Sequence, residues 1–364
     1  MKTPLSALAA QDAAEHRRRL LEFFAQTRSL MIGAFTVGLD DILAELSAEF
    51  CYVVAAEISP QARQATSPDT TGRVFSTDKL QERLAREHAM VRMIPRHHAK
   101  YWIGGLGEEE QPMGVLFSGD LMPSALSPEE PSGNSHELLL ELTPDESVEL
   151  AAFARWVMHG RPAKDILPAY NKPLSGGPAA IPKLKRLLLT QPNLSLQKDA
   201  SLLIDQAEHS IVATTWLLEE DCRVVQRLIS AAATLPVTVI AHDHQMNLPA
   251  LGRLAEAGAK VLLCPGMHAK ILLIDEAHDS SAIVTSANLL KEGYETGLEL
   301  GLKLSRGDER LSRLSQFLAA RLPPVPGEGS FACRKTKSSH YRHKGYRQSA
   351  KDRRPRQDFL SGEC

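Results

Sequence analysis

The tripeptide His-Ala-Lys occurs twice in this chain of 364 residues, at His98–Lys100 and at His268–Lys270. Each copy ends a stretch of the same organisation, in which short apolar runs alternate with segments that are apolar at helical spacing. Such alternation is typical of the strands and helices of α/β proteins, and chains longer than about 300 residues usually divide into more than one core. The sequence therefore predicts an α/β fold of two duplicated lobes, each a mainly parallel sheet flanked by helices.

The predicted elements follow one order in both halves. Strands are expected at 29–35, 51–58 and 90–94, then at 210–216, 237–242 and 260–264; helices are expected at 40–48, 79–87, 221–233 and 248–257. A stretch rich in Pro and Gly separates the halves, which is typical of a linker. We therefore expect a first lobe at 1–157, a linker at 158–195, a second lobe at 196–325 and a tail at 326–364.

The second tripeptide is followed by polar residues at a characteristic spacing. After His268 and Lys270 come Asp275, Ser286 and Asn288, and then Glu299 within Leu-Glu-Leu-Gly. This pattern resembles the HKD motif of the phospholipase D superfamily. The resemblance implies two phospholipase D-like lobes that act on a phosphodiester, with both histidines facing one phosphate.

The first copy departs from the family pattern at two positions. Gly105 replaces the family aspartate, a mild loss because the tyrosyl-DNA phosphodiesterase branch also lacks it. Asp120 stands where the family has asparagine, and a carboxylate cannot donate a hydrogen bond to phosphate. We therefore prefer Ser118 as the donor in this half, with Asn134 as the alternative. The Pro- and Ser-rich insert at 122–135 is expected to be a flexible loop over the site.

In the mechanism that the resemblance implies, one neutral histidine attacks phosphorus and forms a phosphohistidine, while the other protonates the leaving oxygen. By the family's habit His98 is the nucleophile and His268 the acid, although the fuller second motif leaves the reverse order open. Lys100 and Lys270 would hold the non-bridging oxygens, because charge gathers there during transfer. The resemblance also gives each histidine an orienting glutamate, and the candidates are Glu299 and Glu141. No metal ion or cofactor is expected.

The C-terminal segment has the composition of a binding tail. Ten basic residues and one acid, Asp352, lie between Arg334 and Arg356, with Tyr341 and Tyr346 among them. Such a segment is too polar to fold alone, so we expect a disordered basic tail. Its charges suit nucleic-acid phosphates and its tyrosines suit exposed bases. An anionic membrane is the less favoured partner, and a role in solubility alone is the remaining alternative.

The remaining features narrow the function class. The sequence has no apolar stretch of membrane-spanning length and no secretory signal, and its five cysteines lack CxxC spacing, so we expect a cytoplasmic protein. The pair His242 and His244 is interpreted as a solvated strand end and not as a zinc site. The sequence thus favours a metal-independent DNA or RNA nuclease that resembles phospholipase D-like proteins of bacterial restriction and phage-defence clusters, which implies protein partners. The alternatives are a catalytically silent nucleic-acid-binding subunit and a phospholipid headgroup hydrolase.

Overall fold

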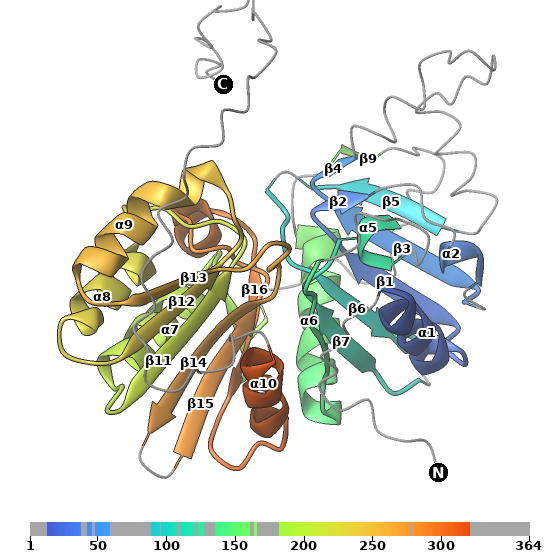
Figure 1. Ribbon diagram of the computed structural model, residues 1–364. Helices are drawn as coiled ribbons and strands as arrows, with labels where there is room; N and C mark the ends of the chain where they lie inside the picture. Colours follow the sequence, from blue (N-terminus) through green and yellow to red (C-terminus); the bar gives the residue numbers. More distant parts are fainter. Residues whose placement is uncertain are drawn as a thin grey trace, which may run out of the picture. The chain divides into compact units, whose positions relative to one another are not determined.

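The computed structural model describes residues 13–37, 42–45, 48–58, 89–94, 96–107, 110–120, 123–126, 135–160, 164–165, 182–276 and 279–320. The expected helix at 79–87, the expected tail at 326–364 and the alternative donor Asn134 lie outside these residues. So does most of the insert at 122–135, of which a short helix, α5 (Pro123–Leu126), is described. Both sheets of the fold belong to one compact unit, Met1–Leu322 (Figure 1).

The first sheet has seven strands in the order β8-β7-β6-β1-β3-β5-β9. Its strands are β1 (Ser29–Gly33), β3 (Phe50–Ala55), β5 (Ala89–Met93), β6 (Tyr101–Gly104), β7 (Met113–Phe117), β8 (Leu139–Glu141) and β9 (Lys164–Asp165). A separate parallel pair joins β2 (Thr36–Val37) to β4 (Glu57–Ile58). The helices of this half are α1 (Ala13–Phe24), α2 (Ile42–Glu45), α5 and α6 (Pro144–Gly160). The described part of the helix expected at 40–48 is therefore only one turn.

The second sheet has the order β10-β16-β15-β14-β11-β12-β13. Its strands are β10 (Leu187–Leu189), β11 (Ser210–Thr215), β12 (Val237–Ala241), β13 (Lys260–Leu263), β14 (Lys270–Glu276), β15 (Asp279–Thr285) and β16 (Leu300–Leu304). Its helices are α7 (Ser195–Asp205), α8 (Arg223–Ala232), α9 (Leu248–Glu256) and α10 (Arg310–Ala319), with short turns η2 (Gln245–Asn247) and η3 (Glu292–Thr296). Six strands of each sheet occur in a corresponding order, β8-β7-β6-β1-β3-β5 in the first sheet and β16-β15-β14-β11-β12-β13 in the second. Strand β10 lies within the segment that the sequence assigns to the linker.

The prediction of mainly parallel sheets is wrong. In the first sheet β1 pairs parallel with β3, and β3 with β5, but the other pairings are antiparallel. The second sheet repeats this pattern, with β11, β12 and β13 parallel and the rest antiparallel. The physical reason is the length of the connections. Parallel neighbours need a crossover, whereas β6 to β7 and β14 to β15 turn back directly as hairpins.

The hairpin after β6 explains why the first half has glycine at position 105. Gly105 has a φ of +71°, and a Cβ there would lie 2.2 Å from the carbonyl oxygen of Gln111. Residues other than glycine rarely adopt this backbone conformation, so an aspartate at position 105 would strain the turn.

The apolar side chains form layers on the two faces of each sheet. Along β14, Ile271 and Leu273 join one buried cluster, while Leu272 and Ile274 join another, as strand alternation requires. The first cluster also includes residues of the first sheet and of α6 and α10, so both halves share this core. The second cluster lies under α7, α8 and α9, and a third packs α1 against the first sheet (Figure 1).

A buried ion pair joins helices from the two halves. The Arg310 guanidinium on α10 donates to both carboxylate oxygens of Glu146 on α6, at 2.7 and 2.8 Å. Glu146 is fully buried and Arg310 is 8% exposed, so water screens this pair little. Arg310 also bonds Asp308 at 2.6 Å, which satisfies further donors of the guanidinium. Within the described part of the chain, no helix is both long and apolar enough to cross a bilayer.

Candidate active site

The two histidines lie just ahead of β6 and β14, in extended segments that pair with the opposite half. The backbone N–H groups of His98 and Ala99 both donate to the carbonyl of Leu298 at 2.9 Å. Those of His268 and Ala269 donate to the carbonyl of His136 at 3.3 and 2.9 Å. The histidines therefore do not lie within strands of their own sheet. Their segments are instead held by single bridges across the interface.

Each histidine is oriented by a glutamate from the other half. His98 Nδ1 lies 2.9 Å from the carboxylate of Glu299, which directly precedes β16. His268 Nδ1 lies 3.0 Å from Glu137, which precedes β8. The expectation that Glu141 has this role is therefore wrong. Glu141 ends β8, where it pairs with Val115, and the insert before Glu137 shifted the alignment of the two halves.

The two serines hold the glutamates in place. Ser286 Oγ donates to Glu299 at 2.5 Å and accepts from the Leu300 N–H at 3.1 Å. Ser118 Oγ donates to Glu137 at 2.5 Å and accepts from Leu138 N–H at 2.7 Å. Each hydroxyl proton is thus committed to a carboxylate. The structure places both serines at the centre, but as supports of the glutamates and not as donors to phosphate.

Two lysine side chains line the same small cavity. Lys100 and Lys270 line it together with Ser118 and Ser286. Lys100 Nζ lies 3.1 Å from His98 Nε2, whereas Lys270 Nζ is buried and has no hydrogen-bond partner among the described residues. An unpaired buried ammonium is costly, so its presence favours an anion as the natural partner of this site. Asp275 lies five residues further along β14, exposed, and bonds Ser280 at 3.1 Å.

Asp120 and Asn288 occupy corresponding positions after β7 and β15. Asn288 Oδ1 accepts from the Leu217 N–H at 3.3 Å, and Asp120 Oδ1 accepts from the Thr36 N–H at 3.3 Å. Asp120 also forms an ion pair with Lys100 at 3.5 Å. The negative charge of this carboxylate, which by itself would repel a bound phosphate, is offset in part by Lys100.

Sequence reasoning missed the aromatic rings beside the histidines. Phe35 lies against His98 with a ring separation of 4.8 Å, and Trp216 meets His268 at 5.4 Å. Trp216 also stacks on His242 at 3.6 Å, so His242 has a packing role in this wall. The signal was available, because Phe35 and Trp216 end the matching strand runs of the two halves.

The buried charges shift one another's proton affinities. Burial, helped by the charges of Lys100 and Lys270, lowers the pKa of His98 well below 6.5. Burial, opposed by Glu137, lowers the pKa of His268. Burial would raise the pKa of Glu137, but His268 and Lys270 hold it at about 2. Burial raises the pKa of Glu299 to about 7 and, with Lys100, lowers that of Lys270 to about 7.

These contacts fix the tautomer of His98. A carboxylate faces Nδ1 and an ammonium faces Nε2, so the ring proton belongs on Nδ1 and the lone pair on Nε2. The side chains of His98 and His268 are each 18% exposed, so an incoming group can reach them. The site can present one neutral nucleophile, one second imidazole and two buried cations to a bound anion.

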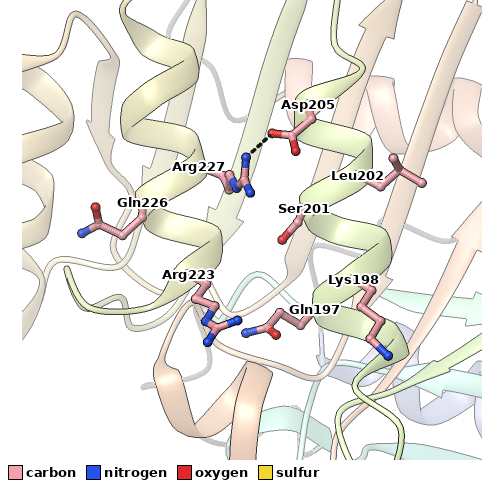
Figure 2. A pocket seen from close by; sticks show the side chains of 8 residues that line it. All are labelled: Gln197, Lys198, Ser201, Leu202, Asp205, Arg223, Gln226 and Arg227. Atoms are coloured by element: carbon pink, nitrogen blue, oxygen red, sulfur yellow. Dashed lines mark hydrogen bonds and ion pairs between the residues drawn. The ribbon is translucent and has the colours of Figure 1, made fainter.

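A separate hollow of about 590 Å³ lies on the surface between α7 and α8 (Figure 2). Its polar wall includes Arg227, which bonds Asp205 at 3.1 Å, and Arg223, which lies 3.8 Å from Glu295. None of its lining side chains belongs to the histidine centre. Within the described ranges, no three His, Cys, Asp or Glu side chains are grouped as metal ligands.

Known proteins resemble this chain in part of its sequence and in its two-sheet α/β fold. Residues 202–318 match the family model described as "Cardiolipin synthase, PLD-like domain". No curated protein sequence matches the chain. Phosphatidylserine synthase from Haemophilus influenzae is 14% identical with a TM-score of 0.61, and the match covers 86% of this chain and 85% of that one.

Two further solved structures are similar. Polyphosphate kinase from Porphyromonas gingivalis is 14% identical with a TM-score of 0.58; the match covers 86% of this chain, which spans 46% of that kinase. Nuc from Salmonella typhimurium, described as a phospholipase D family member, is 15% identical with a TM-score of 0.32 over 37% of this chain and 91% of its own. The synthase and the kinase share the two-sheet α/β fold of this chain.

Proposed function

We propose that the protein is a metal-independent phosphodiesterase that works through a phosphohistidine and cleaves DNA or RNA. The observation that carries the proposal is the crossed arrangement of the centre. Two histidines, each oriented by a glutamate of the other half, flank two buried lysines. Such a centre can supply a nucleophile, a proton and charge stabilisation without further groups.

In the first step, His98 Nε2 attacks phosphorus and the bond from phosphorus to the leaving oxygen breaks. His268 Nε2 gives its proton to that oxygen. In the second step, His268 takes a proton from water, the resulting hydroxide oxygen bonds to phosphorus, and the phosphorus–nitrogen bond breaks. His98 and the protonated His268 are thereby restored, and one water has been consumed.

Two observations favour His98 as the nucleophile. Its lowered pKa and the ammonium at Nε2 keep it neutral with the lone pair available. His268 faces Glu137, whose pKa of about 2 keeps it ionised, and an ionised carboxylate stabilises the imidazolium that a general acid needs.

The nucleic-acid substrate rests on the basic segment Arg334–Arg356, which the sequence places after the second half. Its lysines and arginines suit a polyanion with many phosphates, and its tyrosines suit exposed bases. A role in phage defence or restriction, with protein partners, belongs to the same proposal. Helicase or methyltransferase genes beside the gene would support it, and phospholipid enzymes there would oppose it.

The test is cleavage of end-labelled single- and double-stranded DNA and RNA in excess EDTA. Wild type should cleave at least one of these, His98→Ala and His268→Ala should not, and the exposed His209→Ala should behave as wild type. When the reaction is quenched during turnover, wild type should carry label on the protein in an acid-labile and alkali-stable form, and His98→Ala should carry none. Loss of cleavage in EDTA with recovery in magnesium would refute the proposal, as would wild-type activity in either histidine variant.

A phospholipid headgroup hydrolase is the second candidate. The family model matched by 202–318 is described as "Cardiolipin synthase, PLD-like domain", and the structurally similar synthase makes, by its name, phosphatidylserine. Turnover of anionic liposomes without cleavage of any nucleic acid would favour this candidate. Salt-sensitive nucleic-acid binding without turnover of either substrate would favour a silent binding subunit.

A further inference from the structure

Asp120 is the point at which the two halves of the centre differ most in charge. Asp120 and Asn288 accept comparable backbone hydrogen bonds, at 3.3 Å each, from the segments that follow β1 and β11. Only Asp120 is ionised, because Lys100 and the Phe35 N–H, at 2.8 Å, hold its pKa below the ordinary value against the effect of burial. The corresponding lysine of the other half, Lys270, has no such partner in the described part of the chain.

The charge of Asp120 acts where the phosphate is expected to bind. Lys100 Nζ lies 3.5 Å from Asp120 and 3.1 Å from His98 Nε2, so one ammonium touches both the carboxylate and the nucleophilic nitrogen. The side chain of Lys100 is fully buried, and solvent screens such contacts weakly. Asp120 adds a third carboxylate, beside Glu137 and Glu299, to a centre with two lysines.

We infer that Asp120 is a specificity-determining residue that makes the centre accept singly charged phosphodiesters and reject doubly charged phosphate groups. A phosphodiester has one negative charge, whereas a phosphomonoester has nearly two at neutral pH. Asparagine at this position would leave the centre more positive by one charge and more tolerant of the second negative charge. The inference rests on the proposed function and narrows it to internal diester bonds of a chain, as opposed to terminal phosphates. Asp120 also weakens retention of the phosphomonoester product.

The experiment compares the binding of dimethyl phosphate and methyl phosphate to the full chain at pH 7.5 by calorimetry, without turnover. Asp120→Asn keeps the oxygen that accepts from the Phe35 N–H and removes the charge. The ratio of methyl phosphate affinity to dimethyl phosphate affinity should rise on the order of tenfold in this variant. Asp199→Asn, which removes a carboxylate that pairs with Lys303 on the surface, should leave the ratio unchanged.

Asn288→Asp is the reciprocal variant and should lower the ratio. If Asp120→Asn does not fold, as thermal unfolding would show, this variant decides the question alone. An unchanged ratio in a folded variant that binds both ligands overturns the role of Asp120 and leaves the proposed function standing. If neither wild type nor the variants bind either phosphate, the centre is not an oxyanion site, and the proposed function fails together with the inference.

Discussion

Replacement of Glu137 by glutamine tests the link between a carboxylate of one half and a histidine of the other. Glu137 is 3% exposed, accepts from Ser118 and lies 3.0 Å from His268 Nδ1. Burial by itself would raise its pKa, but the charges of His268 and Lys270, together with the hydrogen bonds from His268 and Ser118, lower the pKa from an ordinary 4.5 to about 2. That difference corresponds to about 3 kcal/mol, since one pKa unit is worth about 1.4 kcal/mol. If this energy stabilises the imidazolium form of His268, Glu137→Gln should lower kcat about a hundredfold.

The assay is steady-state cleavage of an oligonucleotide, whose alkoxide leaving group needs a proton, beside bis(p-nitrophenyl) phosphate, whose leaving group does not. In Glu137→Gln, the rate of the bond-breaking step should fall strongly with the oligonucleotide and only slightly with bis(p-nitrophenyl) phosphate. An initial burst of nitrophenol should therefore persist with the second substrate. Glu141→Gln is the matched control, because Glu141 is four residues away, at the end of β8 and opposite Val115, while Glu137 is the glutamate that bonds His268. Full activity in Glu137→Gln, or an equal loss in Glu141→Gln, would refute the reasoning.

Three further variants test the charges of the fold. Because Lys270 has a pKa of about 7, it loses its positive charge as pH rises through 7. The KM of wild type should therefore rise above that pH. Arginine stays charged over this range, so a pH profile of KM for Lys270→Arg should lack the rise. Lys270→Met should be inactive yet more stable to urea by about 1 kcal/mol at pH 6. The unfolded chain keeps this proton up to pH 10.5, so the stability gain should shrink between pH 7 and 10.5, and a constant gain would contradict the assignment. Arg310→Ala removes both hydrogen bonds of its guanidinium to the buried Glu146 and leaves only the weaker pair with the exposed Arg186, at 3.3 Å, so it should cost about 3 kcal/mol in the same denaturation assay. Arg253→Ala, from an exposed pair, should cost less than about 1 kcal/mol.

The sequence predicted the elements that local patterns determine. The apolar runs at 237–242 and 260–264 correspond to β12 and β13, and the amphipathic stretch at 248–257 corresponds to α9. Strand direction was not predictable in the same way. The runs after each His-Ala-Lys pair as antiparallel hairpins, and apolar periodicity does not distinguish a hairpin from a crossover.

The members of the site were predictable where the motif is local and not where the contact is between the halves. His268 and Lys270 are two residues apart, so an extended backbone brings both to one side. Glu137 faces a histidine 131 residues away, and the insert before it misaligned the glutamates of the two halves. The serine roles were also missed, because spacing alone does not show that a hydroxyl proton is already committed to a carboxylate.

Because each histidine is oriented by a glutamate of the other half, the two halves depend on each other for activity. A substitution in one half disables the opposite half's imidazole, so the two tripeptides cannot serve as independent sites with additive activity. A chain cut in the Pro- and Gly-rich stretch would give two fragments, each with a histidine but without its glutamate. Neither fragment would turn over substrate by itself, whereas a mixture that reassembles would regain both pairs at once.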